Sequence, residues 1–291
     1  MKNTSLILGC GDIGTTLGLQ LAEAGHRVIG VRRHPQSLDD TPIEPLALDL
    51  NDSAALAQLP EADIIVYVAS ADHFDETAYR AAYLDGLKAV LDEFGRREAA
   101  PKRVFFVSST GVYAQQDGEQ VDEHSPTEPH GFSGQLMLAA EQALQAHSLP
   151  GTVVRFSGIY GPGRDRLIQQ VREGRMGAAI PPMYTNRIHR DDCAGVLAHL
   201  IEMTLAEREI DTLYLASDCE PVPLHEVTAW LAQRLKVESS ATMQSPLKRR
   251  SSKRCNNTRL CETGYRFRYP TFREGYAELL ATGAATRPEK A

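Results

Sequence analysis

The chain has 291 residues, of which 42% are hydrophobic and 24% charged, and its net charge at pH 7 is −7. A chain of this length buries roughly 75% of the surface that its unfolded form exposes, so its fold requires neither disulfides nor a metal. The acidic balance argues against a general nucleic-acid or membrane-surface protein, because binding to phosphate groups depends on clustered lysine and arginine. One basic run, residues 248–254, is best interpreted as a solvated loop or helix start.

Five cysteines are scattered through the chain without a Cys-x-x-Cys pair. This distribution favours reduced thiols over a disulfide framework or a zinc site. The apolar run at residues 6–8 is too short for a signal peptide. No segment reaches the ~20 apolar residues that span a bilayer. We therefore expect a cytoplasmic protein with no nucleic-acid or membrane partner.

Short apolar segments alternate with helical patterns through the first half of the chain, which is typical of βαβ units and a parallel sheet. The predicted strands are 5–8, 27–31, 45–48, 64–69, 103–108 and 152–156. The predicted helices between them are 14–24, 74–97 and 133–146, each with small or apolar residues at helical spacing. These elements predict an α/β protein, a Rossmann fold with a doubly wound parallel sheet.

The pattern becomes less regular after Gly161-Pro162-Gly163, where we predict helices at 191–203, 224–235 and 272–280 and a strand at 212–217. A Rossmann dinucleotide-binding domain is expected over residues 1–162, with residues 188–218 returning to it. Residues 163–187 and 219–281 are expected to form a smaller C-terminal substrate lobe. The polar residues 282–291 would then be a frayed tail.

A glycine loop, Gly9-Cys10-Gly11-Asp12-Ile13-Gly14, joins the first predicted strand to the first predicted helix. Gly9 permits a tight turn, Gly11 lets the backbone approach a pyrophosphate, and Gly14 allows close packing of helix on strand. The backbone N–H groups that open the helix, at Asp12 and Ile13, offer the positive end of the helix dipole to an anion. The sequence therefore predicts a dinucleotide site, with a plain strand–helix turn as the alternative.

The end of the second predicted strand carries two arginines, Arg32 and Arg33, and no carboxylate follows until Asp39. NAD-binding proteins usually place an acidic residue here to bind the ribose 2′-hydroxyl. Two guanidinium groups can instead bind a 2′-phosphate through charge-assisted hydrogen bonds, whereas a carboxylate would repel it. The sequence favours NADP as the cofactor, with NAD as the alternative if both arginines are simply solvated.

Four ordered motifs resemble the extended short-chain dehydrogenases/reductases, the NAD-dependent epimerase/dehydratase group, over almost the whole chain. They are residues 107–113 (VSSTGVY), 155–163 (RFSGIYGPG), 186–192 (NRIHRDD) and 257–270, which include Asn257-Thr258-Arg259-Leu260, Gly264-Tyr265 and Tyr269-Pro270. The third is similar to the family's R-x-x-H-x-x-D segment. The glycine loop departs from the family's G-x-x-G-x-x-G pattern, which would place a glycine at Leu8. That departure shifts the turn but leaves pyrophosphate binding intact.

The resemblance also implies a catalytic Tyr-x-x-x-Lys pair, which this chain lacks. The matching positions hold Ser133 and Met137, and residues 114–150 contain neither tyrosine nor lysine. A serine hydroxyl does not ionise as a tuned phenol does, and loss of a general acid or base typically costs about 10²–10⁴ in rate. The family's usual proton transfer is therefore expected to be altered or lost.

Other site residues follow from the resemblance. Ser109 matches the catalytic serine and would orient a carbonyl; the alternative is a hydroxyl that caps the strand end. His130 precedes the helix that should carry the tyrosine and could exchange a proton near neutral pH; the alternative is a merely exposed loop histidine. Cofactor contacts are expected from Asp49, Ala69, Ser70 and Ser108, and substrate contacts from Tyr160 and Arg187.

Two functions remain open from the sequence. One is an NADP-dependent oxidoreductase or epimerase-like enzyme that acts on a small polar or nucleotide-linked substrate with an altered proton-transfer group. The other is a non-catalytic dinucleotide-binding sensor or regulator. Retained Ser109, Tyr160 and Arg187 favour the enzyme, and the substituted Tyr/Lys pair favours the sensor. The resemblance further implies a homodimer formed through the helices at 74–97 and 133–146.

Overall fold

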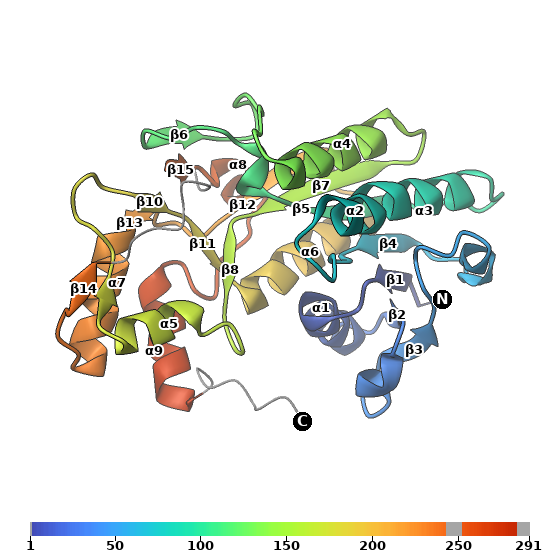
Figure 1. Cartoon of the computed structure of the whole chain (residues 1–291). Coiled ribbons are helices and arrows are strands. Elements are labelled where there is room, and N and C mark those ends of the chain that lie inside the picture. Colours follow the sequence, from blue (N-terminus) through green and yellow to red (C-terminus); the bar gives the residue numbers. More distant parts are fainter. Residues whose placement is uncertain (1, 243–251, 284–291) are drawn as a thin grey trace. The chain divides into compact units, whose positions relative to one another are not determined.

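The structure is a computed structural model that describes residues 2–242 and 252–283. Its central element is a seven-stranded parallel sheet with strand order β12-β7-β5-β4-β1-β2-β3 (Figure 1). The strands are β1 (Thr4–Leu8), β2 (Arg27–Arg32), β3 (Glu44–Ala47), β4 (Ile64–Tyr67), β5 (Arg103–Ser109), β7 (Gly151–Phe156) and β12 (Leu213–Ala216). The order reverses at β1, so the predicted doubly wound Rossmann sheet is confirmed.

Helices cover the sheet, and its central strands are apolar on both faces for that reason. All four residues of β4 are buried, as are the last four of β1. The principal helices are α1 (Asp12–Glu23), α3 (Gly86–Gly95), α4 (Phe132–Ala146) and α6 (Arg190–Leu205). Short 3-10 turns occupy Pro35–Leu38 (η1), Ala55–Gln58 (η2) and Thr110–Val112 (η4). Helices α3 and α4 lie side by side in Figure 1.

The helix predicted over residues 74–97 is interrupted. It consists of α2 (Glu76–Tyr79), a π-helical turn (Arg80–Asp85) and α3. The buried Tyr67 donates its hydroxyl to the Ala82 carbonyl at 2.6 Å. A Cβ atom at Gly86 would lie 2.4 Å from the Tyr67 oxygen. The wider turn therefore accommodates a tyrosine at the end of β4, which the spacing of residues along the helix could not reveal.

The chain divides into two compact units. The first comprises residues 1–112, 127–155 and 194–214, and the second comprises 113–126, 156–193 and 215–291. Residues 113–126, which the expected boundaries gave to the first domain, thus belong to the second unit. The reason is that β6 (Glu119–Val121) pairs in parallel with β15 (Lys253–Cys255). Lys253 is only 6% exposed and Arg254 is exposed, so this end of the basic run is a strand with one buried lysine and not a solvated loop. Residues 248–251 of the run lie outside the described residues.

The second unit packs helices around a small apolar core. Its remaining elements are β8 (Gly158–Tyr160), β9 (Arg175–Met176), β10 (Tyr184–Thr185), β11 (Arg187–His189), β13 (Val222–Pro223), β14 (Ala241–Thr242), α5 (Arg166–Arg172), α7 (Leu224–Leu235), α8 (Thr258–Glu262) and α9 (Phe272–Thr282). The core includes Ile168, Val227 and Phe272. A capping box between Thr271 and Glu274 begins α9. Residues 284–291 of the expected tail lie outside the described residues.

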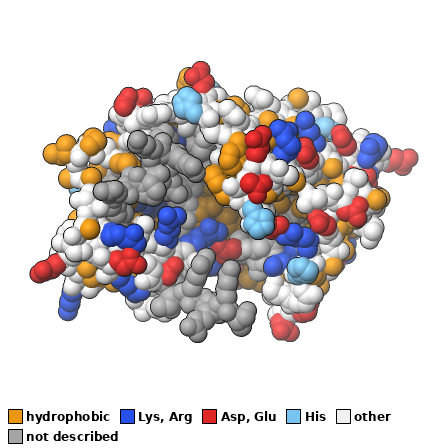
Figure 2. Space-filling view, in the orientation of Figure 1, with side chains coloured by type: hydrophobic (Ala, Val, Ile, Leu, Met, Phe, Trp, Pro, Cys, Tyr) orange, Lys and Arg blue, Asp and Glu red, His pale blue; other side chains and the backbone are white. Residues whose placement is uncertain are grey.

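Acidic and basic side chains are interspersed on the face that Figure 2 shows, apart from the atoms drawn in grey.

No helix in the described part of the chain has both the length and the apolar character that crossing a bilayer requires. Within residues 2–242 and 252–283, histidine, cysteine and carboxylate side chains form no group suited to holding a metal ion.

Candidate functional site

The glycine loop forms a tight turn against β4. Gly9 has φ +88°, and a Cβ atom there would lie 2.4 Å from the Ala69 Cα, so two predicted site residues are in direct contact. The N–H groups of Gly9 and Cys10 both donate to the Val31 carbonyl, at 3.0 and 2.9 Å. These contacts fix the turn between the ends of β1, β2 and β4.

Helix α1 begins at this turn without a side-chain cap on Gly11. The first hydrogen bond of the helix runs from the Thr15 N–H to the Gly11 carbonyl at 2.8 Å. The backbone N–H groups of Ile13 and Gly14 therefore lie at the start of the helix, before its first hydrogen bond. Amides at the positive end of a helix dipole bind anions. A Cβ atom added at Gly11 would meet just the Gly9 carbonyl oxygen, at 3.8 Å, so the loop is open at this position and the residues present fit a dinucleotide diphosphate.

Arg32 lies beside this loop. Its Nη1 donates to the Cys10 carbonyl at 3.4 Å and to the Ser37 hydroxyl at 2.8 Å. A guanidinium next to a hydroxyl is a suitable pair of donors for a phosphate monoester. Ser37 was not among the predicted site residues, although its turn, Pro35-Gln36-Ser37, follows closely after the two arginines in the sequence.

Arg33 is directed elsewhere. Its guanidinium donates two hydrogen bonds to the carboxylate of Asp72, at 2.8 and 2.6 Å. These bonds lower the pKa of Asp72 from its usual value. Both side chains are about half exposed. The two predicted arginines thus diverge, and only Arg32 contacts the glycine loop.

The remaining cofactor candidates lie at strand ends. Asp49 is exposed, and its Oδ1 accepts hydrogen bonds from the backbone N–H of Asn51 at 3.0 Å and from its side-chain amide at 3.1 Å. This geometry is an Asx turn, which stabilises the strand end without any ligand. Ser70 is also exposed, two residues beyond the Val68 that continues β4. An adenine contact from Asp49 stays a prediction.

Ser108 is buried in an ionic cluster. Its hydroxyl donates to Oε1 of Glu141 at 2.5 Å, and Nη2 of Arg155 donates to Oε2 of the same carboxylate at 2.5 Å. Each of the three residues is less than 5% exposed. The Ser108 side chain, expected at the cofactor, is therefore occupied in the core between β5, β7 and α4.

Ser109 and Ser133 lie on neighbouring segments. The half-buried Ser109 accepts the Gly111 N–H at 3.1 Å, within the turn that follows β5. The first turn of α4, which carries Ser133, packs directly on this turn, because a Cβ atom at Gly134 would lie 2.8 Å from the Gly111 carbonyl oxygen. Met137 is buried one turn further along α4. His130 is exposed on the loop before the helix.

An aromatic cluster adjoins the start of α4. Phe74 lies 5.4 Å from Tyr79 and 5.2 Å from Phe132, measured between ring centroids, and Phe74 is 61% exposed. This cluster could not be predicted from the sequence, because Phe132 is far from Phe74 and Tyr79 along the chain. Burial raises the pKa of Tyr79 above its usual value, so its phenol is a poor substitute for the missing catalytic tyrosine.

The structure buries both predicted substrate contacts within the second unit. Tyr160 is 3% exposed, with its ring 4.7 Å from that of Tyr276. Arg187 is 7% exposed and donates to the Thr185 hydroxyl at 2.8 Å. Burial raises the pKa of Asp218 to about 8, and the nearby Arg187 opposes this rise. Both predicted residues therefore belong to a buried polar cluster.

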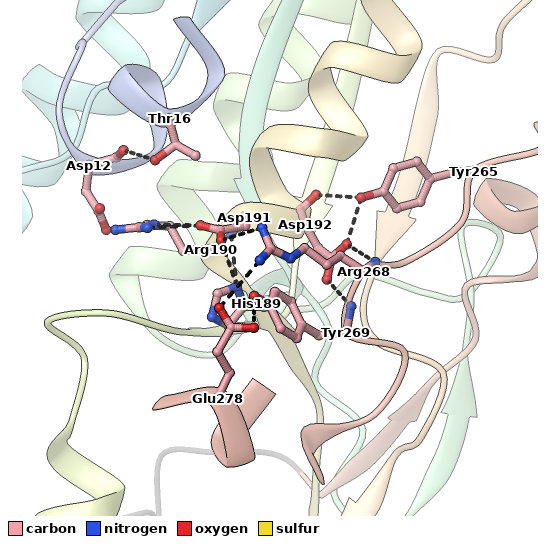
Figure 3. Close-up of polar contacts among 10 residues, drawn as sticks. All are labelled: Asp12, Thr16, His189, Arg190, Asp191, Asp192, Tyr265, Arg268, Tyr269 and Glu278. Atoms are coloured by element: carbon pink, nitrogen blue, oxygen red, sulfur yellow. Dashed lines mark hydrogen bonds and ion pairs between the residues drawn. The ribbon is translucent and has the colours of Figure 1, made fainter. Parts of the chain in front are cut away.

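The motif at residues 186–192 holds the C-terminal segment. The Asp192 carboxylate accepts the Tyr265 hydroxyl at 2.8 Å and the backbone N–H groups of Arg268 and Tyr269 at 2.8 and 3.0 Å (Figure 3). His189 is 2% exposed and its ring centroid lies 4.0 Å from that of Tyr269. Burial lowers the pKa of His189. These residues anchor a loop, and the imidazole of His189 is packed within it.

The reversed strand order and the glycine turn before α1 define a Rossmann-type nucleotide-binding protein. Residues 5–203 match the NAD dependent epimerase/dehydratase family, and the chain belongs to that family. No curated protein is matched by this sequence.

Solved structures extend the match over the whole fold. One from Methylobacillus flagellatus, described as an NAD-dependent epimerase/dehydratase, is 37% identical with a TM-score of 0.81, over 97% of this chain and 99% of its own. A conserved protein of unknown function from Silicibacter pomeroyi is 30% identical with a TM-score of 0.78, over 98% and 100%. The human epimerase family protein SDR39U1, solved with NADPH, shares 20% identity and a TM-score of 0.76 over 96% and 99%. Other matches were solved with NAD.

Proposed function

We propose that the first unit binds NADP and that the chain is an NADP-dependent oxidoreductase or epimerase-like enzyme for a small polar or nucleotide-linked substrate. The observation that carries the cofactor choice is the contact of Arg32 with both the Cys10 carbonyl and the Ser37 hydroxyl. A 2′-phosphate bound there would meet a guanidinium and a hydroxyl. The human family protein solved with NADPH supports this proposal. Because another similar structure was solved with NAD, the preference for NADP over NAD must be tested for this chain itself.

Calorimetric titration of the full chain with NADP and with NAD tests this choice. A charge-assisted hydrogen bond contributes about 1.5–3 kcal/mol, so Arg32→Ala should weaken NADP binding tenfold or more. The affinity for NAD should not change. Arg27→Ala is the matched control, because Arg27 lies at the other end of β2 and pairs with Glu44. Equal affinity of the unmodified chain for both dinucleotides would overturn the proposal.

Asp72→Asn separates the contributions of the two arginines. In the structure Arg33 is engaged by Asp72, so the substitution releases its guanidinium and removes a carboxylate that repels phosphate. We expect tighter NADP binding in this variant. An unchanged affinity would mean that Arg32 alone recognises the 2′-phosphate.

The proposed chemistry uses the hydride that bound NADPH supplies. Ser109, at the end of β5, would donate a hydrogen bond to the substrate carbonyl, and His130 or a water molecule would transfer the proton. NADPH oxidation across a panel of carbonyl compounds and sugar nucleotides tests this scheme. Removing a single carbonyl-directed donor should lower the rate about 10²–10³-fold in Ser109→Ala. NADP affinity should be unchanged in that variant.

A second function, a non-catalytic NADP sensor, is supported by one specific observation. Met137 replaces the lysine of the family pair and is buried, so no ammonium lies one turn beyond Ser133 on α4. Absence of turnover with every substrate of the panel, together with tight NADPH binding, would favour this function over the enzyme.

We also propose a homodimer in which α3 and α4 form the interface. These two helices pack together in the first unit, as Figure 1 shows. Light scattering on the purified chain should give twice the chain mass of 32.0 kDa. Charge substitution at Lys88, an exposed residue of α3, should then shift the population to monomers.

A further inference from the structure

Two cysteines of the second unit lie together at its surface. Cys219 is exposed on the loop after β12, and Cys261 is partly buried on α8. Burial raises the pKa of Cys261, and interaction with the Cys219 thiol raises it further. Both cysteines contact the same residue, Asn257, although 42 positions separate them in the chain (261 − 219).

Asn257 holds both cysteines. Its side-chain amide donates to the Cys219 sulfur at 3.5 Å and to the Ser217 carbonyl at 2.8 Å. Its backbone carbonyl accepts the Cys261 N–H at 3.1 Å. The Cys219 N–H donates to the Pro270 carbonyl at 2.8 Å. One residue therefore fixes the loop of Cys219 against the first turn of α8.

We propose that Cys219 and Cys261 form a reversible oxidation site that closes to an intramolecular disulfide with oxidants of the peroxide class. The Cys219 thiolate attacks a peroxide oxygen and becomes a sulfenic acid, and hydroxide leaves. The Cys261 sulfur then attacks the Cys219 sulfur, and water leaves as the disulfide forms. With hydrogen peroxide, two thiols are oxidised by two electrons overall and one hydrogen peroxide molecule is reduced to two water molecules.

The roles of the two sulfurs follow from their surroundings. Cys219 is exposed and meets the oxidant first, whereas Cys261 is partly buried and acts as the resolving thiol. The other three cysteines are buried. Burial raises the pKa of Cys10, and it raises that of Cys255 to about 12. These thiols should not compete for the oxidant.

The disulfide would also constrain the second unit. It closes a loop that contains α7, and a closed loop reduces the entropy of the unfolded chain. We expect the oxidised chain to unfold at a temperature roughly 5 °C above the reduced chain. Dithiothreitol should reverse the shift.

The test treats the reduced full chain with one equivalent of hydrogen peroxide, blocks free thiols with an alkylating reagent under denaturing conditions, and maps peptides by mass. We expect a peptide pair joined through Cys219 and Cys261, with the other three cysteines alkylated. Cys261→Ser should instead leave a sulfenic acid at Cys219 that dimedone traps. Cys193→Ser, a buried control, should form the disulfide normally.

Two results would overturn the proposal. One is a wild-type chain in which Cys219 proceeds to sulfinic acid while Cys261 stays a free thiol. The other is a disulfide that joins either cysteine to a different partner. Both outcomes are read from the unmodified chain, so they do not depend on the folding of a variant.

Discussion

Single residues at the glycine loop meet two distinct physical demands. Gly9 combines a positive φ with a neighbouring backbone so close that a Cβ atom would clash with Ala69. Gly25, which ends α1, has φ +93° but has open space around it. A side chain at Gly25 would therefore cause backbone strain alone, whereas a side chain at Gly9 would cause both backbone strain and a steric clash.

We expect Gly25→Ala to lower the free energy of unfolding by about 1 kcal/mol, because only conformational strain is added. Gly9→Ala should cost more than about 3 kcal/mol and abolish dinucleotide binding, since the turn must move away from β4. Urea unfolding and calorimetric titration with NADP measure the two effects. Equal destabilisation by both substitutions would contradict the close approach at Gly9.

The buried carboxyl group of Asp218 should make the stability of the fold depend on pH. Burial raises its pKa from the usual 3.8 to about 8, so the folded chain binds this proton more tightly than the unfolded chain does. Its contribution to stability is therefore full below pH 3.8 and is lost as the pH rises through 8. His189 acts in the opposite sense, because its pKa is lowered.

The corresponding variant is Asp218→Asn, which cannot titrate. We expect the melting temperature of the unmodified chain to fall by roughly 5 °C more than that of the variant between pH 5 and pH 9. The His189 contribution is common to both chains and cancels in the comparison. Parallel melting curves across this range would contradict a buried, protonated Asp218.

At the scale of elements, α4 is joined to two strands by a buried ion pair. Glu141 of α4 accepts hydrogen bonds from Ser108 of β5 and from Arg155 of β7. Desolvating two charges offsets most of their attraction, but removing one partner leaves the other charge buried and unpaired. The main role of the ion pair is therefore to fix the position of α4 on the sheet. Its net contribution to the free energy of unfolding is small.

Replacing one partner should be far more damaging than replacing both. Glu141→Leu or Arg155→Met alone should reduce the free energy of unfolding by about 3–5 kcal/mol. The double variant should recover most of this loss, because no buried charge remains. Urea unfolding of the three variants forms a double-mutant cycle, and additive losses would contradict the coupling.

At the scale of the whole molecule, the two compact units alternate along the chain. Residues 127–155 and 194–214 complete the first unit after the chain has entered the second. Strand β7 and helix α4 both come from these later segments and both adjoin β5. The fold of the first unit therefore requires most of the chain.

A fragment of residues 1–112 should consequently fail to fold. Its β5 would lack β7 at its edge, and α4, which packs on β5, would be missing, so buried apolar surface of β5 would be exposed. We expect a broad, non-cooperative thermal transition by circular dichroism and aggregation on gel filtration. A fragment with a sharp transition would show that the later segments are dispensable.

The sequence by itself determined the sheet, the glycine turn and the family, because these depend on periodicity and spacing within short segments. It also located α7 at residues 224–235 without error. The sequence did not predict the π-helical turn that interrupts the helix at 74–97, because the turn accommodates Tyr67, which lies on another element.

Only the tertiary structure decided which candidate residues come together. Arg32 turns to the glycine loop while Arg33 turns to Asp72, although the two are adjacent in sequence. The burial of Tyr160 and the contact of Asn257 with Cys219 likewise arise from segments far apart in the chain. Such contacts depend on strand order and packing, and neither can be predicted from the pattern of residues within a short segment.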